Sequence, residues 1–157
     1  MTTLTPNVSA QVEAHIAEFI RLDDAWGSIP VYEGQTSEDY ALPMVAVVAT
    51  NSEDIGYDTD CSWRKVTLQI SILTSLFIPI ADADGNTEAL DPDAATNHAD
   101  AAGLLASILQ DYTVPTQGED AFANVFGWEP AGIQEQQSDR HYQTSFTINV
   151  SAAPYFD

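Results

Sequence analysis

Basic residues are scarce in this chain of 157 residues. It carries 4 Lys and Arg against 24 Asp and Glu, which gives a formal net charge of -20 at pH 7. A groove that neutralises nucleic-acid phosphates needs clustered basic side chains, and an anionic membrane surface attracts the same side chains. The scarcity of cations therefore excludes tight binding to a nucleic-acid backbone and disfavours binding to a membrane surface.

Paired cysteines, long apolar runs and a recognisable signal peptide are also missing. Cys61 is the single cysteine, so it makes no disulfide within the chain and needs no oxidising compartment. The longest apolar runs, at 44–49 and 76–80, fall far short of the ~20 residues of a membrane-spanning helix. The first residues show neither the basic nor the apolar region of a signal peptide. We therefore expect synthesis in the cytoplasm of the cell that makes the protein.

Catalytic motifs are missing as well. The sequence contains no nucleophile elbow, His-Glu-x-x-His motif, phosphate loop or dinucleotide fingerprint. On a helix, His98 and Asp100 point to different faces, so we expect His98 to be a packed or interface residue. Scattered carboxylates and three histidines are the only support for an enzyme. We predict a protein that is not an enzyme and that needs no cofactor.

Apolar residues are abundant enough for one core. They make up 45% of the chain, and aromatic residues make up 10%. A chain of this length buries roughly 69% of its extended surface on folding, which is ample for one core and too little for two comfortable domains. We predict a single domain over residues 1–157, with a short C-terminal tail from about residue 152.

Helical spacing of apolar residues predicts two amphipathic helices. The first covers residues 8–22. The second starts at Asp91-Pro92-Asp93, which offers an Asp cap and a proline in the first turn, and it runs to about Asp111. Small residues fill the first half of this second helix, which would let another backbone approach closely.

The remaining apolar patterns are typical of strands. Valine-rich or alternating segments predict strands at 44–49, 65–72, 122–128, 133–137 and 146–151. We expect polar loops at 51–60 and 81–91 and a turn at 129–132. Segment 76–80 is interpreted as a bulge or as an edge segment covered by a partner. The predicted fold is α+β, with one mostly antiparallel sheet of about five or six strands and the two helices packed on it.

Residues 82–93 are similar to the start of a calcium loop. Oxygen ligands at alternate positions can wrap a hard cation, and the candidates are Asp82, Asp84, Asn86, Glu88 and Asp93. The sixth position is Thr87 where the sharp turn needs glycine, and the twelfth is an Asp, shorter than the usual bidentate Glu. An acidic turn is the preferred interpretation, and a small calcium-dependent binding module is the alternative.

Large aromatic residues are numerous for a small domain. They include Trp26, Trp63, Phe77, Trp128, Tyr155 and Phe156. Some belong to the core, but a C-terminal tail with two adjacent rings cannot bury both. Because aromatic side chains often anchor subunit contacts, we predict an assembly interface at this tail and at segment 76–80.

The acidity has three interpretations. A Lys-poor acidic surface suits folding in high salt, where charges are screened over ~3 Å at 1 M. It also suits a passage through which another polyanion moves without adhering. The third interpretation is a soluble surface that resists aggregation. The sequence leaves all three open.

Several features follow one another in a familiar order. They are the helix at 8–22, Pro30-Val31-Tyr32, the strand Pro43-Met44-Val45-Ala46-Val47, the strand ending Ile70-Ser71-Ile72-Leu73-Thr74, the histidine-led helix at 98–109 and the closing strand at 140–150. This layout resembles the tail terminator (tail-completion) family of long-tailed phages and related tailed viruses. The resemblance covers nearly the whole chain through patterns of residue types.

The resemblance implies a structural virion protein without catalytic residues. Such proteins form a six-fold ring at the head-proximal end of a finished tail tube, stop its polymerisation and dock to the head connector. It therefore implies a homo-hexamer between a tail-tube protein and a head–tail connector protein, with DNA passing through without tight binding. The alternative is another neck, minor tail or tail-tube subunit, and a tube subunit would polymerise without limit.

Few cations are available for ion pairs between subunits of such a ring. Arg64, Lys65 and Arg140 are the candidates for pairing with carboxylates of a neighbour. With Phe77, Tyr155 and Phe156 they complete the set of predicted interface residues. The small number of basic residues departs from an ordinary member of the family, and a halophilic or marine host would explain it.

Overall fold

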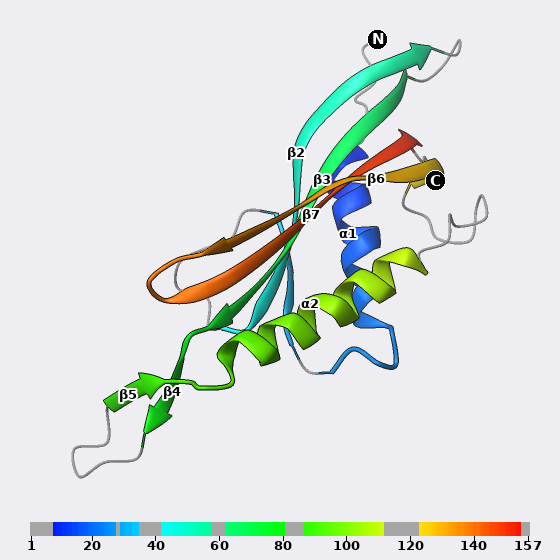
Figure 1. Cartoon of the computed structure of the whole chain (residues 1–157). Coiled ribbons are helices and arrows are strands. Elements are labelled where there is room, and N and C mark those ends of the chain that lie inside the picture. The colour runs from blue at the N-terminus through cyan, green and yellow to red at the C-terminus, as the bar shows by residue number, and fades with distance from the viewer. Residues whose placement is uncertain are drawn as a thin grey trace.

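A computed structural model describes residues 8–27, 29–34, 42–57, 62–80, 87–111 and 123–154. In chain order the elements are α1 (Val8–Arg21), β1 (Val31–Glu33), β2 (Met44–Tyr57), β3 (Ser62–Ser75), β4 (Phe77–Ile80), β5 (Thr87–Leu90), α2 (Ala94–Gln110), β6 (Ala123–Gln137) and β7 (His141–Pro154). Figure 1 shows their arrangement. No helix among these residues is long and apolar enough to cross a membrane.

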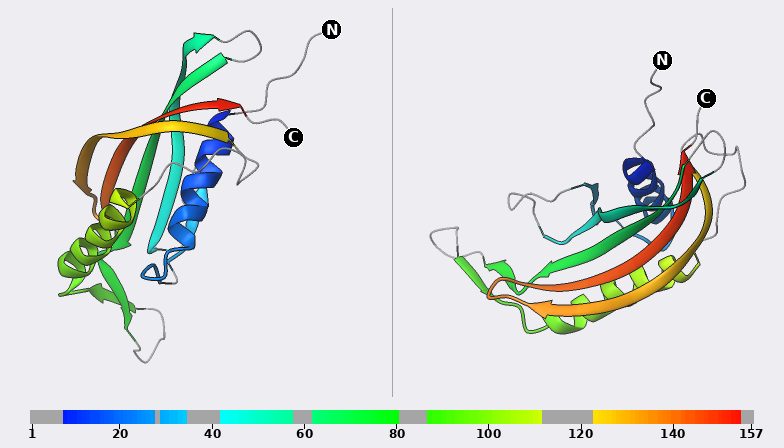
Figure 2. Two further views of the ribbon diagram at one scale, coloured as in Figure 1. Left: turned by 90° about the vertical axis from the view of Figure 1, so that its right-hand side faces the viewer. Right: turned by 90° about the horizontal axis from the view of Figure 1, so that it is seen from above.

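The main sheet has five strands in the order β1-β2-β3-β7-β6. Strand β1 pairs with β2 in parallel, and every other pair in this sheet is antiparallel. Strands β4 and β5 form a separate two-stranded antiparallel sheet, which projects from the body of the molecule (Figures 1 and 2). The predicted α+β class, mostly antiparallel with two helices, is confirmed.

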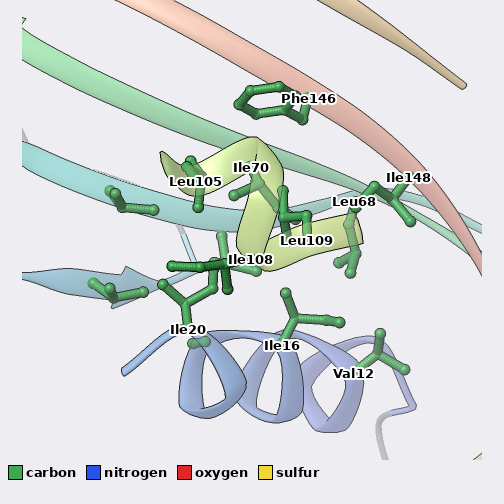
Figure 3. Close-up of a cluster of buried hydrophobic side chains, with 14 of the residues drawn as sticks. Val12, Ile16, Ile20, Leu68, Ile70, Leu105, Ile108, Leu109, Phe146 and Ile148 are labelled. Carbon is green, nitrogen blue, oxygen red and sulfur yellow. The ribbon is translucent and has the colours of Figure 1, made fainter. Parts of the chain in front are cut away.

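Both helices pack on one face of the main sheet. Alternate residues of β3, from Val66 to Ile72, point to this face and are fully buried, as their period-two pattern predicts. Side chains of α1 and α2 meet them there, for example Ile16 and Leu105 (Figure 3). Trp26, which follows α1, is buried in the same core, and its indole N–H donates to the carbonyl of Ile29 at 3.1 Å.

Three predicted connections prove to be strands. The predicted loop at 51–60 is wrong for residues 51–57, because β2 continues to Tyr57. The predicted turn at 129–132 is wrong, because β6 runs through it. The predicted loop at 81–91 contains β5. In each case polar residues gain ladder hydrogen bonds from a neighbouring strand, and this outweighs their low intrinsic preference for strands.

Proline and glycine in β6 are accommodated by irregular pairing. The register with β7 shifts between Val125 and Gly127 and again between Pro130 and Gly132. A proline cannot donate to a ladder, so in sheets it occurs at edge strands and bulges, and β6 is an edge strand with such a shift. Segment 76–80, predicted as a bulge or covered edge, forms β4 of the small sheet.

Helix α2 begins later than the sequence indicates. The Asp91 side chain accepts from the backbone N–H of Asp93 at 2.9 Å, which makes a turn before the helix. The helix begins at Ala94 with Asp93 at the N-cap, where its side chain makes no capping hydrogen bond. Pro92 therefore precedes the first turn instead of lying in it. At the other end of the chain, β7 continues through Pro154.

Candidate assembly surface

The β4–β5 hairpin, called the arm from here on, comprises residues 77–80 and 87–90. Three side chains meet at its base. Arg140, in the turn between β6 and β7, donates from Nη2 to Oε2 of Glu88 at 2.7 Å. Its guanidinium carbon lies 4.5 Å from the centre of the Phe77 ring. Backbone hydrogen bonds from Leu76 N–H to Arg140 O at 3.0 Å and from Asp91 N–H to Leu76 O at 2.8 Å hold the same junction.

This junction contributes little to the stability of the fold. Its main effect is to fix the position at which the arm leaves the body. The Arg140 and Glu88 side chains are 63% and 50% exposed, and such a pair contributes about 0–1 kcal/mol. A cation–π contact at an exposed site adds a similar amount, about 0.5–1 kcal/mol. Two predicted interface residues, Phe77 and Arg140, thus contact each other within one chain.

The calcium-loop candidates do not converge in the described part of the chain. Glu88 lies in a strand and pairs with Arg140, and Asp93 is exposed at the N-cap of α2. Asp82, Asp84 and Asn86 lie outside the described residues. Among the described residues, no group of three or more His, Cys, Asp or Glu side chains is placed to hold a metal ion.

The other predicted interface residues lie elsewhere. Arg64 donates from Nε to the hydroxyl of Ser52 at 2.6 Å and from Nη2 to the Ser52 carbonyl at 3.0 Å. Lys65 stands opposite Glu53 in the β2–β3 ladder. Both are near the start of β3, whereas Phe77 follows its end, about 40 Å away along the chain at the rise of a strand. Tyr155 and Phe156 lie outside the described residues.

His98 is buried between the sheet and α2. Its Nδ1 lies 2.8 Å from the hydroxyl of Thr74, and its Nε2 lies 2.7 Å from the hydroxyl of Thr144. Its ring centre is 5.4 Å from that of Tyr142. Burial lowers the pKa of the imidazole below its ordinary value of 6.5, and the Glu135 carboxylate opposes this shift. The expectation of a packed histidine is confirmed.

Two adjoining hollows lie between α2 and the β6–β7 hairpin. Their volumes are about 550 Å³ and about 430 Å³, and both are lined by Ile133 and Phe146, so they form one continuous groove. We call it the α2–β6 groove. Its helical wall consists mainly of small residues, namely Ala95, Ala99, Ala102, Gly103 and Ala106. The small-residue pattern was visible in the sequence, but Ile133 was not singled out.

Comparison with known proteins gives a likeness of fold. No protein-family model and no curated protein matches the chain. Among solved structures, the chain is similar to a chain of the "Virion of native gene transfer agent (GTA) particle". The TM-score is 0.56 at 12% sequence identity, and the match covers 92% of this chain and 95% of that chain. At this identity the likeness shows a shared fold over nearly the full length.

Proposed function

We propose that the protein is a structural component of a tailed virus or virus-like particle, and specifically a tail terminator. The observation that carries the proposal is the fold likeness over 92% of the chain to a chain of a gene transfer agent virion. It agrees with the tail terminator resemblance of the sequence. In this role the chain forms a hexameric ring between the tail tube and the head–tail connector and stops further growth of the tube.

The charge distribution supports this role. A net charge of -20 repels DNA, so a genome could pass through a ring of such subunits without adhering. The described arginines are occupied within the chain, since Arg21 pairs with Glu18 and Glu33, and Arg140 pairs with Glu88. Repulsion between subunits of equal charge weakens with salt. We therefore propose a ring that assembles more readily at high ionic strength.

Mass and shape in solution test the proposal. Size exclusion with light scattering at ~0.1 M and ~2 M salt, with negative-stain images of each peak, separates the candidate roles. The salts are chosen because the screening length shortens from ~10 Å to below ~3 Å over this range. We expect discrete six-fold rings that do not grow and that are favoured by the higher salt. Open-ended tubes would identify a tube subunit instead, and a monomer in both salts would contradict assembly into a ring.

A further inference from the structure

We propose that the arm of one subunit binds in the α2–β6 groove of a second copy of the chain. This inference rests on the ring proposed above and names its subunit contact. It follows from two surfaces of one molecule that both expose apolar side chains and have opposite shapes, one projecting and one hollow.

The arm has the features of a segment that binds a partner. Among the described residues its two strands pair with each other and not with the main sheet, and it projects from the body (Figures 1 and 2). Its side chains Ile78 and Leu90 are 43% and 69% exposed. An isolated two-stranded hairpin is marginally stable in water, so an arm of this kind gains order when another surface covers it.

The groove has room for such an arm. Ile133 in its floor is 65% exposed, and a Cβ added at Gly103 in its wall meets no atom within 4 Å. Strand β6 is the last strand of the main sheet, so its outer backbone edge borders the groove without a strand partner among the described residues. An exposed strand edge of this kind can pair with a strand from another chain.

Charge selects a second copy as the occupant. Two chains of net charge -20 can approach closely only where carboxylates are few. Among the residues that the structure describes, Glu135 is the single acidic side chain lining the groove, and none lining the second hollow is ionisable. At the base of the arm, Arg140 lies against Phe77 and pairs with Glu88, so the carboxylate on the described part of the arm is neutralised. The Arg140 side chain is 63% exposed in this pair, so it can also face Glu135 of the next copy.

The contact joins two different surfaces of the same protein. Such heterologous contacts generate closed rings when the rotation between subunits closes, and filaments when it does not. An isologous contact, in which the groove of one copy meets the groove of another, would stop at a dimer. The arm-in-groove contact is therefore the kind that a ring requires.

Cysteine cross-linking tests the contact. In a Cys61→Ser background, Leu90→Cys protein is mixed with Ile133→Cys protein under mild oxidation at ~2 M salt. Leu22→Cys replaces Leu90→Cys in the control, because Leu22 is equally exposed at 72% but lies at the end of α1. We expect at least ~10-fold more cross-linked product for the Leu90 pair than for the Leu22 pair. Equal yields, or cross-linking of Ile133→Cys only with itself, would overturn the proposal.

A second test fills the groove. We expect Gly103→Leu to abolish assembly while the melting temperature of the subunit is unchanged or raised, since open space surrounds the position. Gly27→Leu, at another exposed glycine with open space, should assemble like the wild type. If wild-type rings form and Gly103→Leu rings form equally well, the arm-in-groove contact is wrong and the ring stands. If the wild type never associates, the ring and the contact are both overturned.

Discussion

The two helices pack on the same sheet face, but they use their surfaces differently. Helix α1 buries Val12, Ile16, Ala17 and Ile20 almost completely along its whole length. Helix α2 buries Ala94, His98, Leu105, Ile108 and Leu109 along its length, while Ala95, Ala99 and Gly103 on its groove side stay exposed. Both helices contribute to the core, and the exposed side of α2 also lines the α2–β6 groove.

The difference originates in the sheet beneath each helix. Helix α1 packs across β1, β2, β3 and β7 and also contacts β6, whereas α2 packs on β3 and β7. Residues 129–137 of β6 are all exposed, so this strand extends past the helix that would cover it. Small residues on α2 keep the resulting groove open. In the proposed ring, the region around α1 would serve folding, and the region around α2, β6 and the arm would serve assembly.

The largest expected effect lies in the region of α1. Ile16→Ala removes a fully buried side chain from the core and leaves a cavity, so we expect a loss of about 2–5 kcal/mol in the free energy of unfolding. Urea denaturation followed by circular dichroism measures it. Leu22→Ala, at an exposed position just past the end of α1, should change stability by less than ~0.5 kcal/mol. Similar losses for both variants would break the comparison.

Enlarging one alanine in each helix sharpens the comparison. Ala17→Leu overpacks a site that is 0% exposed and should cost about 1–3 kcal/mol in stability. Ala99→Leu points into the groove, so it should change the stability of the subunit by less than ~0.5 kcal/mol and reduce assembly instead. Thermal melts and light scattering on the same samples give both quantities. A destabilised Ala99→Leu subunit would show that the groove is part of the core.

The next prediction concerns His98, whose ring connects α2 to the main sheet through hydrogen bonds. His98→Leu leaves the buried hydroxyls of Thr74 and Thr144 without their ring partner, which should cost about 1–3 kcal/mol at neutral pH.

This variant should also change the pH dependence of stability. Because the pKa of His98 is lowered on folding, the unfolded chain binds more protons between the lowered pKa and 6.5. The histidine therefore favours folding fully above pH 6.5, and this contribution falls as the pH drops through that window. The difference in unfolding free energy between wild type and His98→Leu should shrink from pH 7.5 to pH 5. A difference that grows on acidification would contradict the assignment.

The smallest expected effect is at the base of the arm. Arg140→Gln removes an exposed ion pair and a ring contact, so the free energy of unfolding should fall by less than about 1 kcal/mol. The same variant should weaken assembly, because it removes the cation that accompanies the arm. Analytical ultracentrifugation at several concentrations measures that loss. Arg64→Gln is the control, because Arg64 lies at the other end of β3.

The local pattern of apolar residues was sufficient to predict the two helices and the buried face of β3. The apolar spacing of Val12, Ile16 and Ile20 and the alternation from Val66 to Ile72 need no knowledge of distant residues. The extent of β2 and β6 was not predictable in this way. Polar residues such as Asn51 and Glu129 become strand only because Thr67 and Asn149 lie opposite them in the ladder.

The candidate site shows the same limit. Phe77 and Arg140 were each singled out by residue type, but their contact joins positions 63 residues apart through the β6–β7 turn. Glu88 was a candidate ligand only in the less favoured calcium-loop alternative, because its neighbours in sequence are acidic, and its partner in the fold is an arginine. The groove exists because β6 continues through residues 129–132, which the local sequence predicts to be a turn.

Closure of the ring is the central claim, and the mass of the particle as a function of concentration tests it most directly. Light scattering of the wild-type chain at ~2 M salt over a hundredfold range of concentration gives this curve. The account predicts a plateau at about 102 kDa, six times the 17.0 kDa of one chain. A mass that keeps rising with concentration, or one that stays at 17.0 kDa throughout, would contradict it.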